Sequence, residues 1–130
     1  MDSAPGDGRR ILVVGSDPQV RSLLHECLRV WGYEVLEADN GQGGPIAGPM
    51  QMIDGSVPYP IHGVLLDMPL SGGLAAFHTV QRQHPGIPVI VMSAVSDIQL
   101  AREAVNQGAH EYLIKPFDQE LLKTKCLRIF

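Results

Sequence analysis

The segment that decides the fold is residues 87–117, which read IPVIVMSAVSDIQLAREAVNQGAHEYLIKPF. An apolar, largely β-branched run at Ile87–Met92 is typical of a strand that is buried on both faces. A capping-box pattern at Ser96-Asp97-Ile98-Gln99 then predicts the start of a helix, and Gly108 predicts its end. A second strand is expected at His110–Ile114. Two apolar strands joined by a helix indicate a parallel pair with a right-handed crossover.

The rest of the chain repeats this alternation of strands and helices. Three further strands are expected at Ile11–Val14, Tyr33–Glu37 and Gly63–Leu66, and three further helices after Asp17, before Pro85 and after Asp118. The pattern predicts an α/β fold, namely a flavodoxin-like, doubly wound parallel sheet of five strands in the order 2-1-3-4-5 with helices on both faces.

The 130 residues suit a single domain, which we expect to span residues 10–130 after a flexible N-terminal tail at 1–9. Residues 41–60 break the alternation, because nine of these twenty residues are Gly or Pro and only Asp54 is charged. A helix is incompatible with so many prolines. We therefore expect an irregular Gly/Pro-rich loop at 41–60 in place of the second helix.

Composition narrows the environment and the partners. Ten Lys and Arg against fourteen Asp and Glu give a formal net charge of −4, so this domain lacks the basic excess that contacts nucleic acid directly. No apolar run reaches the ~20 residues that cross a bilayer, and the polar N-terminus is unlike a secretory signal. The two cysteines, Cys27 and Cys126, are expected to be buried thiols of a reducing compartment. We predict a cytoplasmic protein with no membrane contact and no direct nucleic-acid contact.

Polar residues follow the apolar runs at several predicted strand ends. Gly15-Ser16-Asp17 follows the first strand, Asp67 the third, Ser93 the fourth and Lys115 the fifth. In a parallel sheet of this type, ligands bind beyond the carboxyl ends of the strands. The sequence therefore predicts a site at this edge with a carboxylate, a hydroxyl and an ammonium group.

Three stretches resemble the receiver domain of two-component response regulators: Val64–Asp67, Pro88–Ala94 and Gly108–Phe117. The likeness covers essentially the whole expected domain, and the last two stretches together are highly specific. It implies a phosphoprotein of phosphorelay signal transduction that receives its signal from a histidine kinase or phosphotransfer protein. It implies no enzyme activity beyond accepting a phosphoryl group and slowly releasing it. A homodimer through the face of the fourth helix, fifth strand and fifth helix is a further implied assembly.

The resemblance also implies a role for each site residue. Asp67 matches the phosphoacceptor, whose carboxylate attacks the phosphoryl group on a kinase histidine to give an acyl phosphate. Lys115 matches the ammonium that neutralises a phosphoryl oxygen, and Ser93 matches the hydroxyl that hydrogen-bonds this group and moves toward it. Tyr112 matches the aromatic switch residue that then turns inward, with an ordinary half-buried strand aromatic as the alternative. Pro69 matches the residue whose backbone carbonyl binds Mg²⁺, the cofactor that the family implies.

Two departures weaken the implied metal site, whose carboxylate ligand is Asp67. Gly15-Ser16 stands where the family has two adjacent acids that hold Mg²⁺, and the loop after Asp67 is shorter than usual. Asp17 is a further metal candidate, although its place before Pro18 suits a helix cap. We therefore expect weak or absent Mg²⁺ binding, which Asp at both Gly15 and Ser16 would strengthen. The alternative hypothesis is an atypical pseudo-receiver that acts by protein–protein contact without phosphorylation.

A flavodoxin-like sheet also suits a flavin- or nucleotide-binding protein, which is the remote alternative. The loop after the first strand lacks the glycine-rich patterns that hold phosphates, and aromatic residues make up only 5% of the chain. The five histidines show no metal-ligand spacing.

Overall fold

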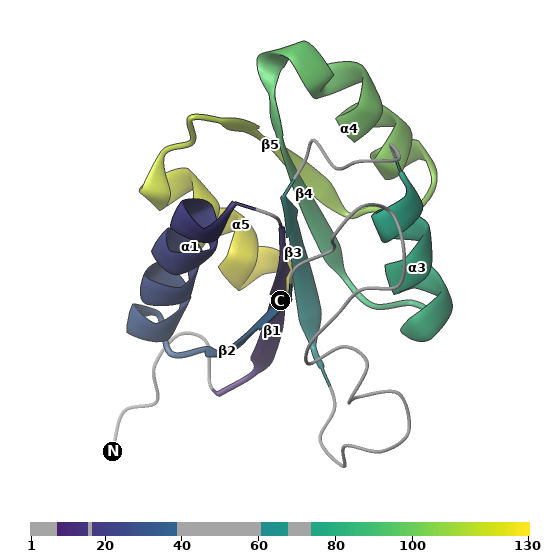
Figure 1. The fold of residues 1–130 in the computed structure, drawn as a ribbon. Helices are drawn as coiled ribbons and strands as arrows, with labels where there is room; N and C mark the ends of the chain where they lie inside the picture. The colour runs from purple at the N-terminus through teal and green to yellow at the C-terminus, as the bar shows by residue number, and fades with distance from the viewer. Residues whose placement is uncertain (1–7, 16, 39–60, 68–73) are drawn as a thin grey trace.

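The predicted strands form one parallel sheet in the computed structural model, which describes residues 8–15, 17–38, 61–67 and 74–130. The strands are β1 (Arg10–Val14), β2 (Glu34–Ala38), β3 (Gly63–Asp67), β4 (Val89–Ala94) and β5 (Glu111–Lys115). Their order is β2-β1-β3-β4-β5, and every pairing is parallel. The predicted fold class and strand order are therefore confirmed (Figure 1).

The α-helices in the described part of the chain cover both faces of the sheet. They are α1 (Pro18–Val30), α3 (Ala75–Gln83), α4 (Ile98–Asn106) and α5 (Gln119–Ile129). Figure 1 shows α1 and α5 on one face and α3 and α4 on the other. This is the doubly wound arrangement that parallel strands with helical crossovers require.

Two apolar clusters, one beneath each pair of helices, form the core. Leu12, Val14, Val64, Leu66, Phe77 and Val80 belong to the cluster on the α3/α4 side. Ile11, Val13, Leu65, Leu24, Leu28 and Leu122 belong to the cluster on the α1/α5 side, together with the buried free thiols Cys27 and Cys126. Successive residues of β1 and β3 thus feed opposite clusters, which explains why these strands are continuous apolar runs in the sequence.

Two of the predicted helix caps are present. The Asp17 side chain accepts hydrogen bonds from the backbone N–H groups at the start of α1, and Pro18 occupies the first turn. The Asp118 side chain accepts a hydrogen bond from Glu120 N at the start of α5. Both helices therefore begin where the sequence predicts, because the carboxylate satisfies N–H groups that lack partners within the helix.

The predicted capping box before α4 is wrong. A 3₁₀ turn, η1 (Val95–Asp97), precedes α4, so the residue before the helix is Asp97 rather than Ser96, and its side chain makes no capping hydrogen bond. The start of β4 also differs from the prediction. Ile87 N donates to the carbonyl of His84 at 3.1 Å in a turn, and the strand begins two residues later at Val89.

Parts of the predicted domain plan lie outside the described residues. These are the irregular loop at 41–60 and residues 1–7 of the predicted tail. Gly8 and Arg9, also assigned to that tail, form backbone hydrogen bonds of 2.9 Å with Gly32 and Glu34. Across the described ranges, no helix combines the length and apolarity needed to cross a membrane.

Candidate functional site

The carboxyl ends of β3, β4 and β5 bring three predicted site residues to one edge of the sheet. Asp67 is the last residue of β3 and pairs with Met92 of β4. Ser93 follows Met92 and pairs with Ile114 of β5, and Lys115 follows Ile114 as the last residue of that strand. The parallel register therefore converts positions far apart in sequence into one cluster, as predicted.

Asp67 and Lys115 form a direct, largely buried ion pair. Lys115 Nζ lies 2.5 Å from Asp67 Oδ1, and the Asp67 side chain is only 6% exposed. Burial raises the pKa of Asp67 above its ordinary value, whereas the hydrogen bond and charge of Lys115 act in the opposite direction. The carboxylate is thus a desolvated anion whose charge is compensated at short range by one ammonium group.

Ser93 presents a hydroxyl that is not used within the described structure. The residue is fully buried, and its Oγ has no hydrogen-bond partner among the described residues. An unpaired buried hydroxyl costs free energy, so in a native protein it calls for an explanation such as a role in binding. Tyr112, the predicted switch residue, is partly buried and packs against the α3/α4-side cluster. Its packing is compatible with both the switch role and the ordinary aromatic role.

Gly15 lies directly against the predicted phosphoacceptor. It follows β1, which pairs with β3 up to Val14 and Leu66. A Cβ atom placed on Gly15 would lie 2.8 Å from Asp67 Cβ, a distance that Cβ atoms in proteins essentially never show, and 3.3 Å from Asp67 Oδ2. The absence of a side chain at this position therefore permits the observed approach of the two strand ends. Ser16 and Pro69, two other predicted site positions, lie outside the described residues.

Asp17 was predicted as a metal candidate and as a helix cap, and in the structure its side chain caps α1. Its Oδ1 accepts hydrogen bonds from Gln19 N at 2.9 Å and Val20 N at 3.5 Å. Its charge still reaches the site, because it contributes to the raised pKa of Asp67. Asp17 is thus a helix cap at the rim of the site.

Arg21, which the sequence did not single out, holds the loop that carries Gly15. Its guanidinium donates to the carbonyl of Gly15 and lies 3.4 Å from a carboxylate oxygen of Glu37. The other carboxylate oxygen of Glu37 lies 2.6 Å from His25 Nδ1. The only sequence signal is that Arg21 falls one helical turn after Asp17, and that spacing does not identify partners on β2.

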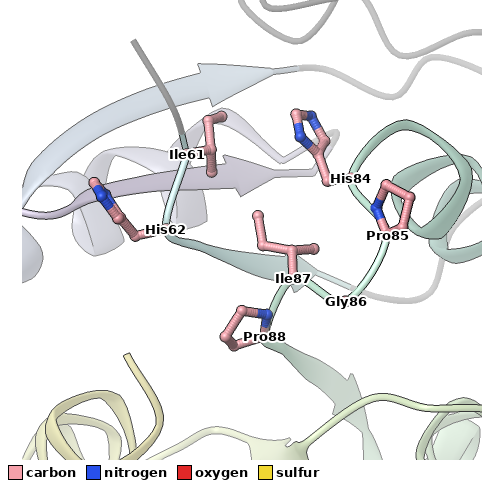
Figure 2. Close-up of a pocket in the computed structure, with 7 residues that line it drawn as sticks. All are labelled: Ile61, His62, His84, Pro85, Gly86, Ile87 and Pro88. Atoms are coloured by element: carbon pink, nitrogen blue, oxygen red, sulfur yellow. The ribbon is translucent and has the colours of Figure 1, made fainter.

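A separate pocket lies at the opposite edge of the sheet. It has a volume of about 500 Å³ and is formed by residues 61–62 before β3 and residues 84–88 before β4. Figure 2 shows its two histidines, His62 and His84, extending from these two different segments. Over the described ranges no group of three or more His, Cys, Asp or Glu side chains is placed to hold a metal ion. This pocket shares no residue with the predicted site.

The residues described at the Asp67 site do not supply a ligand set for Mg²⁺. This ion takes oxygen ligands in a nearly octahedral array, usually with one or two carboxylates. Gly15 offers no side chain, Asp17 caps α1, and Asp67 Oδ1 already faces the Lys115 ammonium. The functional groups that the described site offers are its own carboxylate, hydroxyl and ammonium.

Comparison with known proteins identifies the family. The model of the response regulator receiver domain matches residues 11–127, and the chain belongs to this family. The transcriptional regulatory protein ZraR of Escherichia coli (strain K12) is 34% identical over 119 residues, which cover 90% of this chain and 25% of ZraR. The chain thus spans about a quarter of the length of the curated relatives it matches.

Solved structures agree with this assignment. The receiver domain of NtrX from Brucella abortus has a TM-score of 0.71 at 28% identity, with 91% of this chain and 98% of that chain covered. The receiver domain of the sensor histidine kinase PA1611 from Pseudomonas aeruginosa PAO1 has a TM-score of 0.70 at 26% identity, with 94% and 97% covered. The latter holds a magnesium ion in its active site cleft.

Family membership defines the class of protein. The chain is a response regulator receiver domain of the two-component type. Such domains are signalling modules rather than classical enzymes, they interact with histidine kinases or phosphotransfer proteins, and they generally bind Mg²⁺ in the active site. This membership favours the predicted class over the flavin- or nucleotide-binding alternative.

Proposed function

We propose that this domain receives a signal by phosphorylation of Asp67. The observation that carries the proposal is the buried Asp67–Lys115 ion pair at the carboxyl edge of the sheet, at 2.5 Å. A carboxylate oxygen of Asp67 attacks the phosphorus of a phosphohistidine; the O–P bond forms as the N–P bond breaks. The histidine nitrogen leaves with the electron pair of that bond and takes up a proton from solvent. The same acyl phosphate is slowly hydrolysed, which returns Asp67 to the carboxylate.

Lys115 and Ser93 stabilise the phosphorylated state in this proposal. The ammonium of Lys115 neutralises an oxygen of the incoming phosphoryl group, and this interaction is strong because the site is shielded from water. The Ser93 hydroxyl, which has no partner among the described residues, donates a hydrogen bond to a second oxygen. Phosphorylation thereby gives a buried hydroxyl the partner it lacks.

The response is a shift between two states of the face formed by α4, β5 and α5. When Ser93 turns toward the phosphoryl group, Tyr112 moves inward and changes this face. The face includes a pocket of about 540 Å³ lined by residues that include Tyr112, Leu121 and Lys125. Leu121 is 46% exposed, an apolar contact that a partner would cover. We propose that a homodimer forms through this face. We also propose that residues 10–130 form one receiver domain in the cytoplasm.

The test is the intact mass of the protein after incubation with acetyl phosphate, which supplies the phosphoryl group without a kinase. The expected result is a gain of one phosphoryl group that is absent in Asp67→Asn. Asp118→Asn is the matched control, because it also changes one aspartate to asparagine but keeps a cap for α5 and leaves the Asp67–Lys115 pair in place. Labelling of Asp67→Asn, or none of the folded wild type, would contradict the proposal.

The second candidate function is a pseudo-receiver that works through protein contact alone. The observation that favours it is the close approach of Gly15 to Asp67. Where the family has a metal-binding acid, this chain has a glycine whose position leaves no space for a side chain. Under this hypothesis the same docking faces bind partners whether or not a phosphodonor is present. The test compares the affinities of the wild type and of Asp67→Asn for a histidine kinase domain. Equal affinities, together with no gain in intact mass after incubation with acetyl phosphate, would support this hypothesis.

A further inference from the structure

Within the Asp67–Lys115 pair, the charges balance without a divalent cation. In the family, three carboxylates face one lysine and one Mg²⁺, so three negative charges meet three positive charges. Here Gly15 and Ser16 are both neutral, so Asp67 is paired with Lys115, and Asp17 at the cap of α1 is a further negative charge that acts on Asp67. A Mg²⁺ ion added to this pair would bring two positive charges into a largely buried site, and the negative charge of Asp17, which caps α1, would offset only one of them.

Three of the oxygen atoms described at and beside Asp67 already accept hydrogen bonds. Asp67 Oδ1 accepts a hydrogen bond from Lys115 Nζ at 2.5 Å. The carbonyl of Gly15 accepts from the guanidinium of Arg21, and Asp17 Oδ1 accepts from Gln19 N at 2.9 Å. A Mg²⁺ ion at any of these three oxygens would compete with its donor, and the ion sheds its own water reluctantly.

There is also no space at position 15 for a side chain that could bind a metal ion. The main chain of Gly15 approaches Asp67 so closely that even a methyl group would lie 2.8 Å from Asp67 Cβ. The expectation that aspartates at Gly15 and Ser16 strengthen Mg²⁺ binding therefore meets a steric obstacle at Gly15. An acid can be accommodated there only if the end of β1 moves away from β3.

We propose that the Asp67 site operates without Mg²⁺, with the Lys115 ammonium as the counter-charge for both the free carboxylate and the incoming phosphoryl group. The part that concerns the phosphoryl group rests on the proposed function above. The part that concerns the metal rests on the charges and contacts of Gly15, Asp67 and Lys115, and it holds whether or not Asp67 is phosphorylated.

Two measurements test the proposal. The first follows the backbone amide signals of Asp67 and Lys115 by NMR while MgCl₂ is added to the wild type through the millimolar range. The expected result is no saturable shift, and a saturable shift would overturn the proposal. The second compares acetyl phosphate labelling in MgCl₂ with labelling in EDTA. The labelled fraction is expected to be the same in both, and a loss of labelling in EDTA would overturn the proposal.

The variant Lys115→Gln tests the role of the ammonium group independently of the role of Mg²⁺. This variant keeps a hydrogen-bond donor of similar length but loses the charge, so labelling is expected to fall by at least about tenfold in both buffers. Recovery of its labelling by MgCl₂ would overturn the proposal, because it would show that the site accepts the ion. Failure of the wild type to label in either buffer would instead contradict the phosphoacceptor role, and the NMR titration would then decide the question of the metal by itself.

Discussion

At the scale of single residues, the buried carboxylate of Asp67 carries a cost to stability. Because burial raises its pKa, the folded protein binds a proton on Asp67 more readily than the unfolded chain does. The ionised form at neutral pH therefore destabilises the fold, and this penalty disappears as the pH falls toward the ordinary pKa of aspartate. Asp67→Asn is expected to raise Tm at pH 7, and the gain should shrink as the pH is lowered. Thermal unfolding followed by circular dichroism checks this, and a gain that grows at acidic pH would contradict it.

Gly15 makes a second prediction at this scale. Gly15→Ala places a methyl group 2.8 Å from Asp67 Cβ, so we expect a loss of about 1–3 kcal/mol in the free energy of unfolding. Urea unfolding measures the loss. The matched test combines Gly15→Ala with Asp67→Gly, which removes the opposing Cβ atom, and the two changes should then be less costly together than their sum. Strict additivity would show that the contact is not the cause.

At the scale of elements, the side chain of Asp17 caps α1. Asp17→Ala removes the acceptor for the first N–H groups of the helix and is expected to cost about 0.5–2 kcal/mol in the free energy of unfolding. Asp17→Asn keeps an equivalent cap and should unfold at nearly the same urea concentration as the wild type. If Asp17→Asn were as destabilising as Asp17→Ala, the carboxylate charge rather than the cap would be the stabilising feature.

The elements also show what the sequence could and could not predict. Strands buried on both faces are apolar throughout, so β1, β3 and β4 and their order were predictable from apolar runs separated by helical segments. The end of each strand then placed Asp67, Ser93 and Lys115 at one edge. The start of α4 was not predictable in this way, because Ser96 and Asp97 both suit a cap. Both residues lie in the 3₁₀ turn η1, and α4 begins only after it. Arg21 was missed because its partners, Gly15 and Glu37, come together only in the folded sheet.

At the scale of the whole molecule, the edge of the sheet opposite Asp67 is closed by Phe130. Its ring is 6% exposed and makes an edge-to-face contact with Tyr33, with ring centroids 6.4 Å apart. Its carbonyl accepts a hydrogen bond from Arg9, just before β1. A Cβ atom on Gly63, at the start of β3, would overlap this ring. Residues far apart in the sequence therefore meet at this edge, and the lack of a side chain at Gly63 is what lets the ring of Phe130 lie there.

The packing of Phe130 against Gly63 predicts that the free energy of unfolding can be changed without changing phosphorylation. Gly63→Ala is expected to cost about 1–3 kcal/mol in the free energy of unfolding, because the methyl group collides with the ring of Phe130. Phe130→Leu, which has a smaller side chain, should reduce the cost of Gly63→Ala when the two are combined. Because the contact lies at the edge of the sheet away from Asp67, acetyl phosphate labelling of the folded variants should match the wild type. A change in labelling at a temperature where the variants are fully folded would show that the two edges of the sheet are coupled, and the site would then have to be treated as part of the whole sheet.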